Sequence, residues 1–383
     1  MSTEGIGSSG FNASNVDLTT ADPRDVICAL TFSGNEYNGR LGARISALFV
    51  ILVCSTLATF FPVVAKRVPR LHIPLYVYLF ARYFGAGVIV ATAFIHLLDP
   101  AYEEIGPASC VGMTGAWADY AWCPAIVLAS VFMVFLLDFG AERYVEIKYG
   151  IDSDVGDLED TVTGRQQTAG GRRPSAMQMD RALSIAESRR EHEDRRLFTS
   201  VEEKFKEDFS VEEADSEARK NSFRQQIAAF LILEFGVIFH SVVIGLNLGV
   251  AGDEFDTLYP VLVFHQSFEG LGIGARMSAI PFKPASWLPW ILCTAYGLTT
   301  PLAIAVGLGV RTTYNPNSYT ANVVSGVLDA ISAGILIYTG LVELLARDFL
   351  FNPMRSKDNR RLAFMVVCVL LGAGLMALLG KWA

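Results

Sequence analysis

Eight long apolar runs dominate this 383-residue sequence and restrict it to folds that can place them in a membrane. Each run holds roughly 20 residues or more, the length at which a helix crosses a hydrocarbon core of about 30 Å. Backbone polar groups inside a bilayer must be paired within the segment, which favours helices over open sheets. We therefore predict an all-α, polytopic membrane protein whose eight transmembrane helices form a bundle and occupy residues 41–65, 74–98, 119–143, 226–250, 257–280, 285–310, 321–347 and 361–381.

Composition supports this prediction and separates one charged insert from the rest. Charged residues make up 18% of the chain, below the roughly 25% typical of soluble domains. We predict a tail at residues 1–40, helices one to three within 41–143, a loop at 144–225, and helices four to eight within 226–381. The loop is rich in Asp, Glu, Arg and Ser and poor in apolar residues, so it cannot bury a core. We assign it to the cytosol as largely disordered, with Ser175 after two arginines either a phosphorylation site or part of a solvated linker.

Lys and Arg in the short loops predict the orientation of the helices. One side of the membrane receives ten of these residues, which are Lys66, Arg67, Arg70, Arg276, Lys283, Arg347, Arg355, Lys357, Arg360 and Arg361. The other side receives four, which are Arg24, Arg40, Arg311 and Lys381. The side with more positive charge is cytosolic, so both termini are predicted to be extracellular.

Several modification signals fall on this predicted extracellular side. Asn12 opens the glycosylation sequon Asn12-Ala13-Ser14. Cys28, Cys110 and Cys123 lie in tail or loop-edge positions. A disulfide between Cys110 and Cys123 can close a short loop in an oxidising compartment, although the spacing does not determine which cysteines pair.

The apolar runs 226–250 and 257–280 carry polar side chains near their middles. His265 and Glu269 are one helical turn apart on one face, with Gln266 beside them, and His240 lies near the middle of the preceding run. An ionisable group at that depth costs at least about 2.5–3.5 kcal/mol, so it faces a bundle interior, a cavity or an ion. Two imidazoles and a carboxylate at one depth are ligands that Zn²⁺ and Fe²⁺ accept, with Gln266 and Ser241 as weaker oxygen donors. The alternative is a structural network of hydrogen-bonded polar side chains.

Other polar residues predict a route to and from these side chains. His96 and Asp99 lie near the outer end of the second helix, where they can receive a cation. Asn247 is two turns from His240 on nearly the same face, toward the outside. Glu343 lies toward the inner end of the seventh helix, where it either lines an exit or pairs with an arginine. Glu234 points about 120° away from His240 and is expected to serve another contact.

The sequences around these polar side chains also resemble those of a known family. HSVVIG (240–245) followed by HQSFEG (265–270) is similar to the signature pair of the ZIP (Zrt-, Irt-like) divalent-metal transporters. TAFIHLLD (92–99) and YTGLVELLARDF (338–349) resemble that family too, as does the layout of eight helices with a long loop between the third and fourth. The resemblance covers about residues 40–381 and is strongest to the fungal and plant plasma-membrane branch.

The resemblance implies His240, His265 and Glu269 as the principal metal ligands, with Ser241 and Gln266 nearby. Two features depart from the family pattern. Some members have a bridging carboxylate where this chain has Ile244, so we expect one tightly held ion and not two. Many members also have a histidine-rich cytosolic loop, whereas this one contains only His192.

We therefore predict an integral protein of the plasma membrane that imports Zn²⁺ toward the cytosol, with Fe²⁺ and Mn²⁺ open as further substrates. The alternative is a membrane-embedded zinc hydrolase that uses the same His/Glu cluster to activate water. The sequence shows no HExxH motif and no separate general base, so we expect no enzyme and no cofactor. The expected partners are divalent metal ions and membrane lipid but no nucleic acid, and a homodimer is left open.

Overall fold

The computed structural model describes residues 22, 24, 26–28, 37–68, 74–149, 223–224, 226–283, 285–351, 356 and 358–382. The chain divides into two compact units, one of Met1–Asp138 with Gln226–Ala383 and one of Phe139–Gln225. The second unit corresponds approximately to the predicted loop, and only 139–149 and 223–224 of it are described. The predicted sites Asn12 and Ser175 lie outside the described residues.

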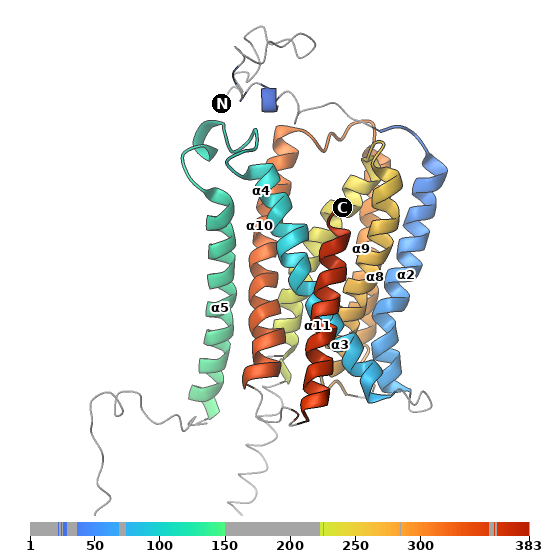
Figure 1. Cartoon of the computed structure of the whole chain (residues 1–383), viewed down its shortest axis with the longest axis vertical. Coiled ribbons are helices and arrows are strands. Elements are labelled where there is room, and N and C mark those ends of the chain that lie inside the picture. Colours follow the sequence, from blue (N-terminus) through green and yellow to red (C-terminus); the bar gives the residue numbers. More distant parts are fainter. Residues whose placement is uncertain are drawn as a thin grey trace, which may run out of the picture. The chain divides into compact units, whose positions relative to one another are not determined.

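Long helices make up the first unit (Figure 1). They are α2 (Leu41–Arg67), α3 (Leu75–Ala91) continued by the π-helical η1 (Thr92–Leu98) and by α4 (Asp99–Ile105), α5 (Trp122–Tyr149, which ends in the second unit), the helix Gln226–Val250, α8 (Phe255–Ala279), α9 (Leu288–Val310), α10 (Tyr319–Tyr338) continued by the π-helical η3 (Thr339–Phe351), and α11 (Asn359–Leu379). A single 3₁₀ turn, η2 (Gly115–Trp117), precedes α5.

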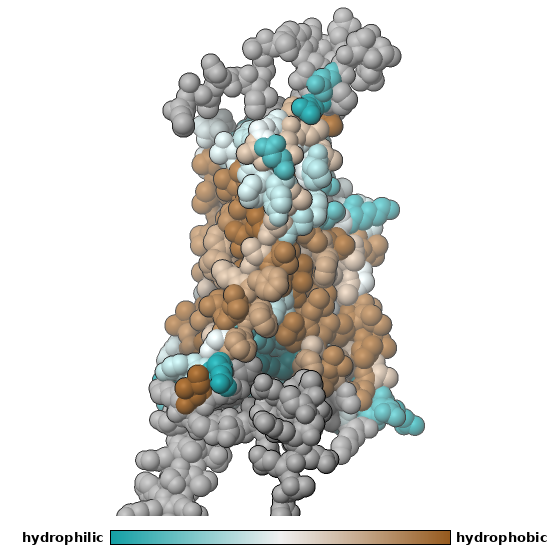
Figure 2. Space-filling model, turned by 90° about the vertical axis from the view of Figure 1, so that its left-hand side faces the viewer, coloured by the Kyte–Doolittle hydropathy of each residue, from teal (hydrophilic) through white to brown (hydrophobic). Residues whose placement is uncertain are grey.

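The predicted class, an all-α polytopic membrane protein, is confirmed. The described part of the chain contains no β-strand, and seven of its helices are long and apolar enough to cross a membrane. The remaining predicted helix, 257–280, is present as α8, but its polar middle makes it less apolar than the other seven. Figure 2 shows a broad band of hydrophobic residues between more hydrophilic ends.

Helices distant in sequence pack side by side in the first unit. α2 lies against α8 and α9, α3 lies against α11 and α8, and α10 lies against η1 and α4 (Figure 1). The contact between α3 and α8 depends on a pair of glycines, because a Cβ atom on Gly85 would lie 2.1 Å from the Cα of Gly272. This pair of glycines lets α8, which carries three of the predicted site residues, approach the backbone of α3 closely.

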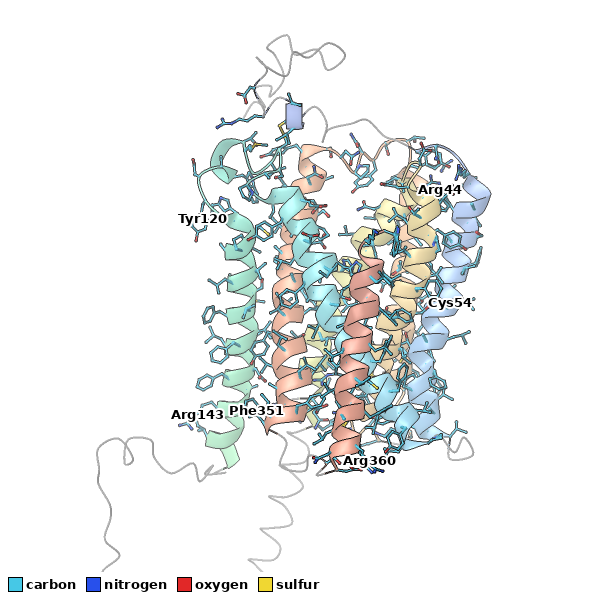
Figure 3. All side chains as sticks on the ribbon, in the orientation of Figure 1. Arg44, Cys54, Tyr120, Arg143, Phe351 and Arg360 are labelled. Atoms are coloured by element: carbon cyan, nitrogen blue, oxygen red, sulfur yellow. A yellow bond between two sulfur atoms is a disulfide. The ribbon has the colours of Figure 1, made fainter. Side chains whose placement is uncertain are left out.

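Arg44 holds one end of the bundle together (Figure 3). Its side chain is fully buried and donates hydrogen bonds to the carbonyl oxygens of Leu248 (3.0 Å), Gly249 (3.2 Å) and Ala251. These carbonyls at the end of the helix Gln226–Val250 have no partner within their own helix. The guanidinium also lies 4.6 Å from the ring centroid of Phe255 at the start of α8. Arg44 of α2 therefore fixes the ends of both helices that carry the polar clusters.

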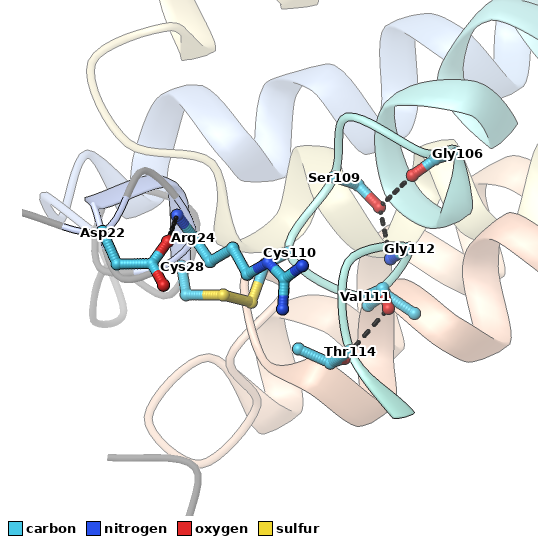
Figure 4. The surroundings of a disulfide bond; sticks show 9 residues. All are labelled: Asp22, Arg24, Cys28, Gly106, Ser109, Cys110, Val111, Gly112 and Thr114. Atoms are coloured by element: carbon cyan, nitrogen blue, oxygen red, sulfur yellow. Dashed lines mark hydrogen bonds between the residues drawn. A yellow bond between two sulfur atoms is a disulfide. The ribbon is translucent and has the colours of Figure 1, made fainter. Parts of the chain in front are cut away.

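A disulfide joins Cys28 to Cys110 in the connection between α4 and α5 (Figure 4). Their Cα atoms are 4.8 Å apart although 82 positions separate them in sequence. The predicted pairing of Cys110 with Cys123 is therefore wrong. Cys123 is a free thiol, buried in a hydrophobic cluster with Ile105 and Val111 at the start of α5. We call this end of the bundle the disulfide end.

Candidate metal site

Two neighbouring helices bring three potential metal ligands together. α8 places His265 and Glu269 one turn apart, and the helix Gln226–Val250 places His240 opposite them. One ligand atom from each of the three side chains lies within 4.8 Å of the others. All three side chains are buried, with at most 2% of their surface exposed. The prediction that these residues share one depth in the bundle agrees with this geometry.

The potential ligand atoms have no hydrogen-bond partners among the described residues. Both ring nitrogens of His240 and His265 and both carboxylate oxygens of Glu269 are buried and unpartnered. The Nε2 atom of His265 lies 3.2 Å from Oε1 of Glu269, but without hydrogen-bond geometry. Buried polar atoms nearly always have a partner, so six such atoms in one place indicate a bound ion or ordered water. Two imidazoles and one carboxylate suit Zn²⁺, which takes this donor set in four-coordinate sites.

Asp329 of α10 is a site residue that the sequence analysis did not select. It is buried, and its Oδ1 atom lies 3.8 Å from Nδ1 of His240. This distance is too long for a hydrogen bond, but it puts a carboxylate beside the ring nitrogen of a potential ligand. The available signal was an acidic residue in the middle of the apolar run 321–347, which in a membrane usually marks a functional position.

His96 lies closer to the cluster than its predicted place at the mouth. It is buried, its ring centroid is 4.6 Å from that of His265, and its Nε2 atom lies 3.0 Å from the carbonyl oxygen of Met376. His96 belongs to η1, a π-helical segment, and such segments are frequent at functional sites. His96 therefore forms part of the wall of the cluster.

A cavity of about 420 Å³ extends from residues near the disulfide end to His240 and His265. The predicted pathway residues Asp99 and Asn247 line it, as does Ile244. Its lining also contains other carboxylates, namely Glu103, Glu104, Glu254 and Asp329. A cavity lined by one sign of charge concentrates counter-ions, in this case cations.

The two weaker candidate ligands, Gln266 and Ser241, are both buried. The Oε1 atom of Gln266 accepts a hydrogen bond of 3.2 Å from the hydroxyl of Tyr296 on α9, while its Nε2 atom has no partner. The hydroxyl of Ser241 likewise has no hydrogen-bond partner among the described residues. Gln266 is thus turned toward α9, and a role in binding an ion stays a prediction.

Glu343 lies away from this cavity, near the opposite end of the bundle. Its Oε2 atom is 2.6 Å from Nη1 of Arg347 and 3.5 Å from Nη2 of Arg276 on α8. Close by, Arg82 of α3 makes a bidentate ion pair with Asp348, at 2.6 and 2.8 Å. Of the two predicted roles for Glu343, the pairing with arginine is therefore present, and it joins α8 to η3.

Comparison with known proteins adds independent information. A family model described as "ZIP Zinc transporter" matches residues 41–380. The chain is 57% identical over 381 residues to Zinc-regulated transporter 1 of Saccharomyces cerevisiae, with 97% of each chain covered. It is 42% identical to Zinc-regulated transporter 1 of Schizosaccharomyces pombe, covering 91% of this chain and 88% of that one. It is 31% identical to Zinc transporter 5 of Oryza sativa subsp. japonica, covering 93% and 91%.

Proposed function

The chain belongs to the ZIP zinc transporter family, and on that premise we propose that it imports Zn²⁺ through a site formed by His240, His265 and Glu269. Membership confirms the resemblance that the two signature motifs indicate. The chain is an integral membrane transporter of divalent metal ions and not an enzyme. The alternative of a membrane-embedded zinc hydrolase is not supported.

The main support for the proposed site is a cavity that ends at this cluster, whose three side chains have no hydrogen-bond partners among the described residues. Its carboxylates attract a hydrated cation. As the ion loses water, the nitrogens of His240 and His265 and an oxygen of Glu269 replace it. His96 and Asp99 receive the ion before it reaches these ligands. The ligand set also suits Fe²⁺, and oxygen donors along the route suit Mn²⁺, so both are further candidate substrates.

The proposed direction of transport rests on assigning the two ends of the bundle to the two sides of the membrane. Disulfides persist in oxidising compartments, so the disulfide end with Cys28 and Cys110 is assigned to the outside of the plasma membrane. The excess of Lys and Arg at the opposite end supports the same orientation, with both termini outside. Release to the cytosol then requires α8 and η3 to separate, which breaks the pair between Arg276 and Glu343. Glu343 stays paired with Arg347, which also belongs to η3.

Three substitutions test the proposed site. His240→Ala, His265→Ala and Glu269→Ala should each abolish most ⁶⁵Zn uptake, because each removes one ligand, while the amount of protein at the cell surface stays similar. Ser130→Ala on α5, a buried polar residue outside the cluster, is the matched control and should transport normally. Normal uptake by all three site variants would refute the assignment, and competition by unlabelled Fe²⁺ and Mn²⁺ would rank the substrates.

A further inference from the structure

Glu234 is a buried acid that the proposed transport site does not use. It lies on the helix Gln226–Val250 with only 3% of its surface exposed, and both of its carboxylate oxygens lack a hydrogen-bond partner. Glu234 forms no ion pair with any other described residue. It is six positions before His240, so it lies about 9 Å from that residue along the helix axis, toward the end opposite the disulfide end.

The side chains that face Glu234 offer no positive charge close to it. Cys293 and Tyr296 of α9 interact with it electrostatically. Arg67 at the end of α2 also acts on Cys293, but its guanidinium donates to the carbonyl of Ser286 (3.1 Å) and lies over the ring of Trp290, 5.3 Å from its centroid. On the other side of the helix, Gly236 packs against Ile335 and Leu336 of α10. An ionised Glu234 would therefore be an uncompensated charge.

Tyr296 places this acid next to the candidate metal site. Its hydroxyl donates to the backbone oxygen of Gln266 at 3.1 Å and to Oε1 of the same residue at 3.2 Å. Tyr296 also interacts electrostatically with both Glu234 and Glu269. Glu234 and the proposed ligand Glu269 thus both interact with one buried tyrosine.

A carboxylate in such surroundings must bind a cation or take up a proton, because an unpaired charge in a membrane interior is costly. We propose that Glu234 is a proton-binding site, and that a metal ion at His240, His265 and Glu269 displaces its proton. The O–H bond of the carboxyl group breaks, the carboxylate keeps the electron pair, and the proton passes to solvent. The inference rests on the proposed metal site. In this proposal, the released proton comes from a residue that does not contact the metal.

The size of the linkage follows from the charges. At about 9 Å, the axial rise from Glu234 to His240, the attraction between a carboxylate and a divalent ion at an effective dielectric constant of about 20 corresponds to roughly a few hundredfold in affinity. Metal binding therefore favours the ionised form of Glu234 by up to that factor, and the same factor must link proton binding to metal affinity. An amide at this position, which cannot ionise, removes the linkage.

The experiment counts protons released when zinc binds. Purified full-length protein, freed of metal, is titrated with ZnCl₂ in weakly buffered detergent solution containing a pH indicator, and the Kd for zinc is measured from about pH 5 to about pH 8. Glu234→Gln should release fewer protons per zinc than the wild type, by up to one. Its log Kd should also depend less steeply on pH, by up to one unit per pH unit. Glu234→Asp keeps the carboxyl group and should release protons as the wild type does. Asp119→Asn, an exposed acid in the connection before α5, is the matched control and should be unchanged.

Other outcomes would overturn the proposal. Equal proton release and equal pH dependence in the wild type and Glu234→Gln would do so, as would the same loss in Glu234→Gln and Glu234→Asp. A Na⁺ dependence of the zinc Kd that disappears in Glu234→Gln would assign Na⁺ to the site instead. If Glu234→Gln does not fold, Glu234→Leu replaces it, because it removes the charge without leaving a polar atom unpartnered. Unchanged zinc binding by His240→Ala would refute the metal site itself, and this result is distinct from all the others.

Discussion

Removing the carboxylate of Asp329 should weaken zinc binding through its effect on His240. The two side chains are buried on different helices, with Oδ1 of Asp329 3.8 Å from Nδ1 of His240. A histidine that binds a metal through Nε2 keeps a proton on Nδ1, and this N–H usually donates to a carboxylate or carbonyl. A small rotation of either side chain brings Asp329 into that role when an ion binds.

The magnitude follows from this geometry. Carboxylate partners of metal-bound histidines typically contribute about 10- to 100-fold in metal affinity, or about 1.4–2.7 kcal/mol. Asp329→Leu removes both the charge and the acceptor, so we expect a loss near the upper end of this range. Asp329→Asn keeps an oxygen that can accept from Nδ1, so we expect a loss near the lower end.

The assay is zinc binding to purified protein, with the KM of ⁶⁵Zn uptake as a second measurement. Ser332→Ala, one turn further along α10 and equally buried, is the matched control. If Asp329 acts through His240, Asp329→Leu should cause little further loss in a His240→Ala background. An unchanged Kd in Asp329→Leu, or an equal loss in both backgrounds, would refute the reasoning.

Four further predictions concern other parts of the chain. Ile244→Glu puts a carboxylate into the cavity beside the proposed ligands, so elemental analysis should find more tightly bound metal per chain than in the wild type; two tightly bound ions in the wild type would contradict this. Gly272→Val should push α8 away from Gly85 and lower the thermal stability in detergent by several degrees, because its Cβ would lie 2.9 Å from the Cα of Gly85; an unchanged melting temperature would refute the close contact. Cys28→Ser should abolish a shift in electrophoretic mobility on reduction, and a persistent shift would indicate a different pairing. Deleting residues 155–220 should leave the KM for zinc unchanged and alter only the amount of protein at the cell surface; altered metal selectivity would contradict this.

The pairing of Glu343 with Arg276 has a consequence for the transport cycle. The pair joins α8, which carries His265 and Glu269, to η3 near the end opposite the cavity. In the proposed cycle, opening at that end separates two charges in a partly buried setting, so we expect the pair to favour the state in which the cavity reaches the proposed ligands. Its strength therefore affects how often the opposite end opens.

Local sequence alone predicted the helices and the three side chains that meet in the central cluster. A run of about 20 apolar residues has one stable conformation in a bilayer, because its backbone must satisfy its own hydrogen bonds. The four-residue spacing of His265 and Glu269 fixes them on one face of a helix, whatever the helix packs against. The depth of His240 follows from its place near the middle of its run. These predictions need no knowledge of which helices are neighbours.

Only the tertiary structure decided which distant residues meet. Asp329 lies beside His240, and Cys28 pairs with Cys110 while Cys123 stays free, because of how separate elements rotate and pack against one another. His96 lies on the π-helical segment that continues α3, with its ring centroid 4.6 Å from that of His265 on a separate helix. Spacing along the chain fixes the angle of a side chain about its own helix axis. The angle between two helices depends on all the side chains at their contact, so no single stretch of sequence contains it.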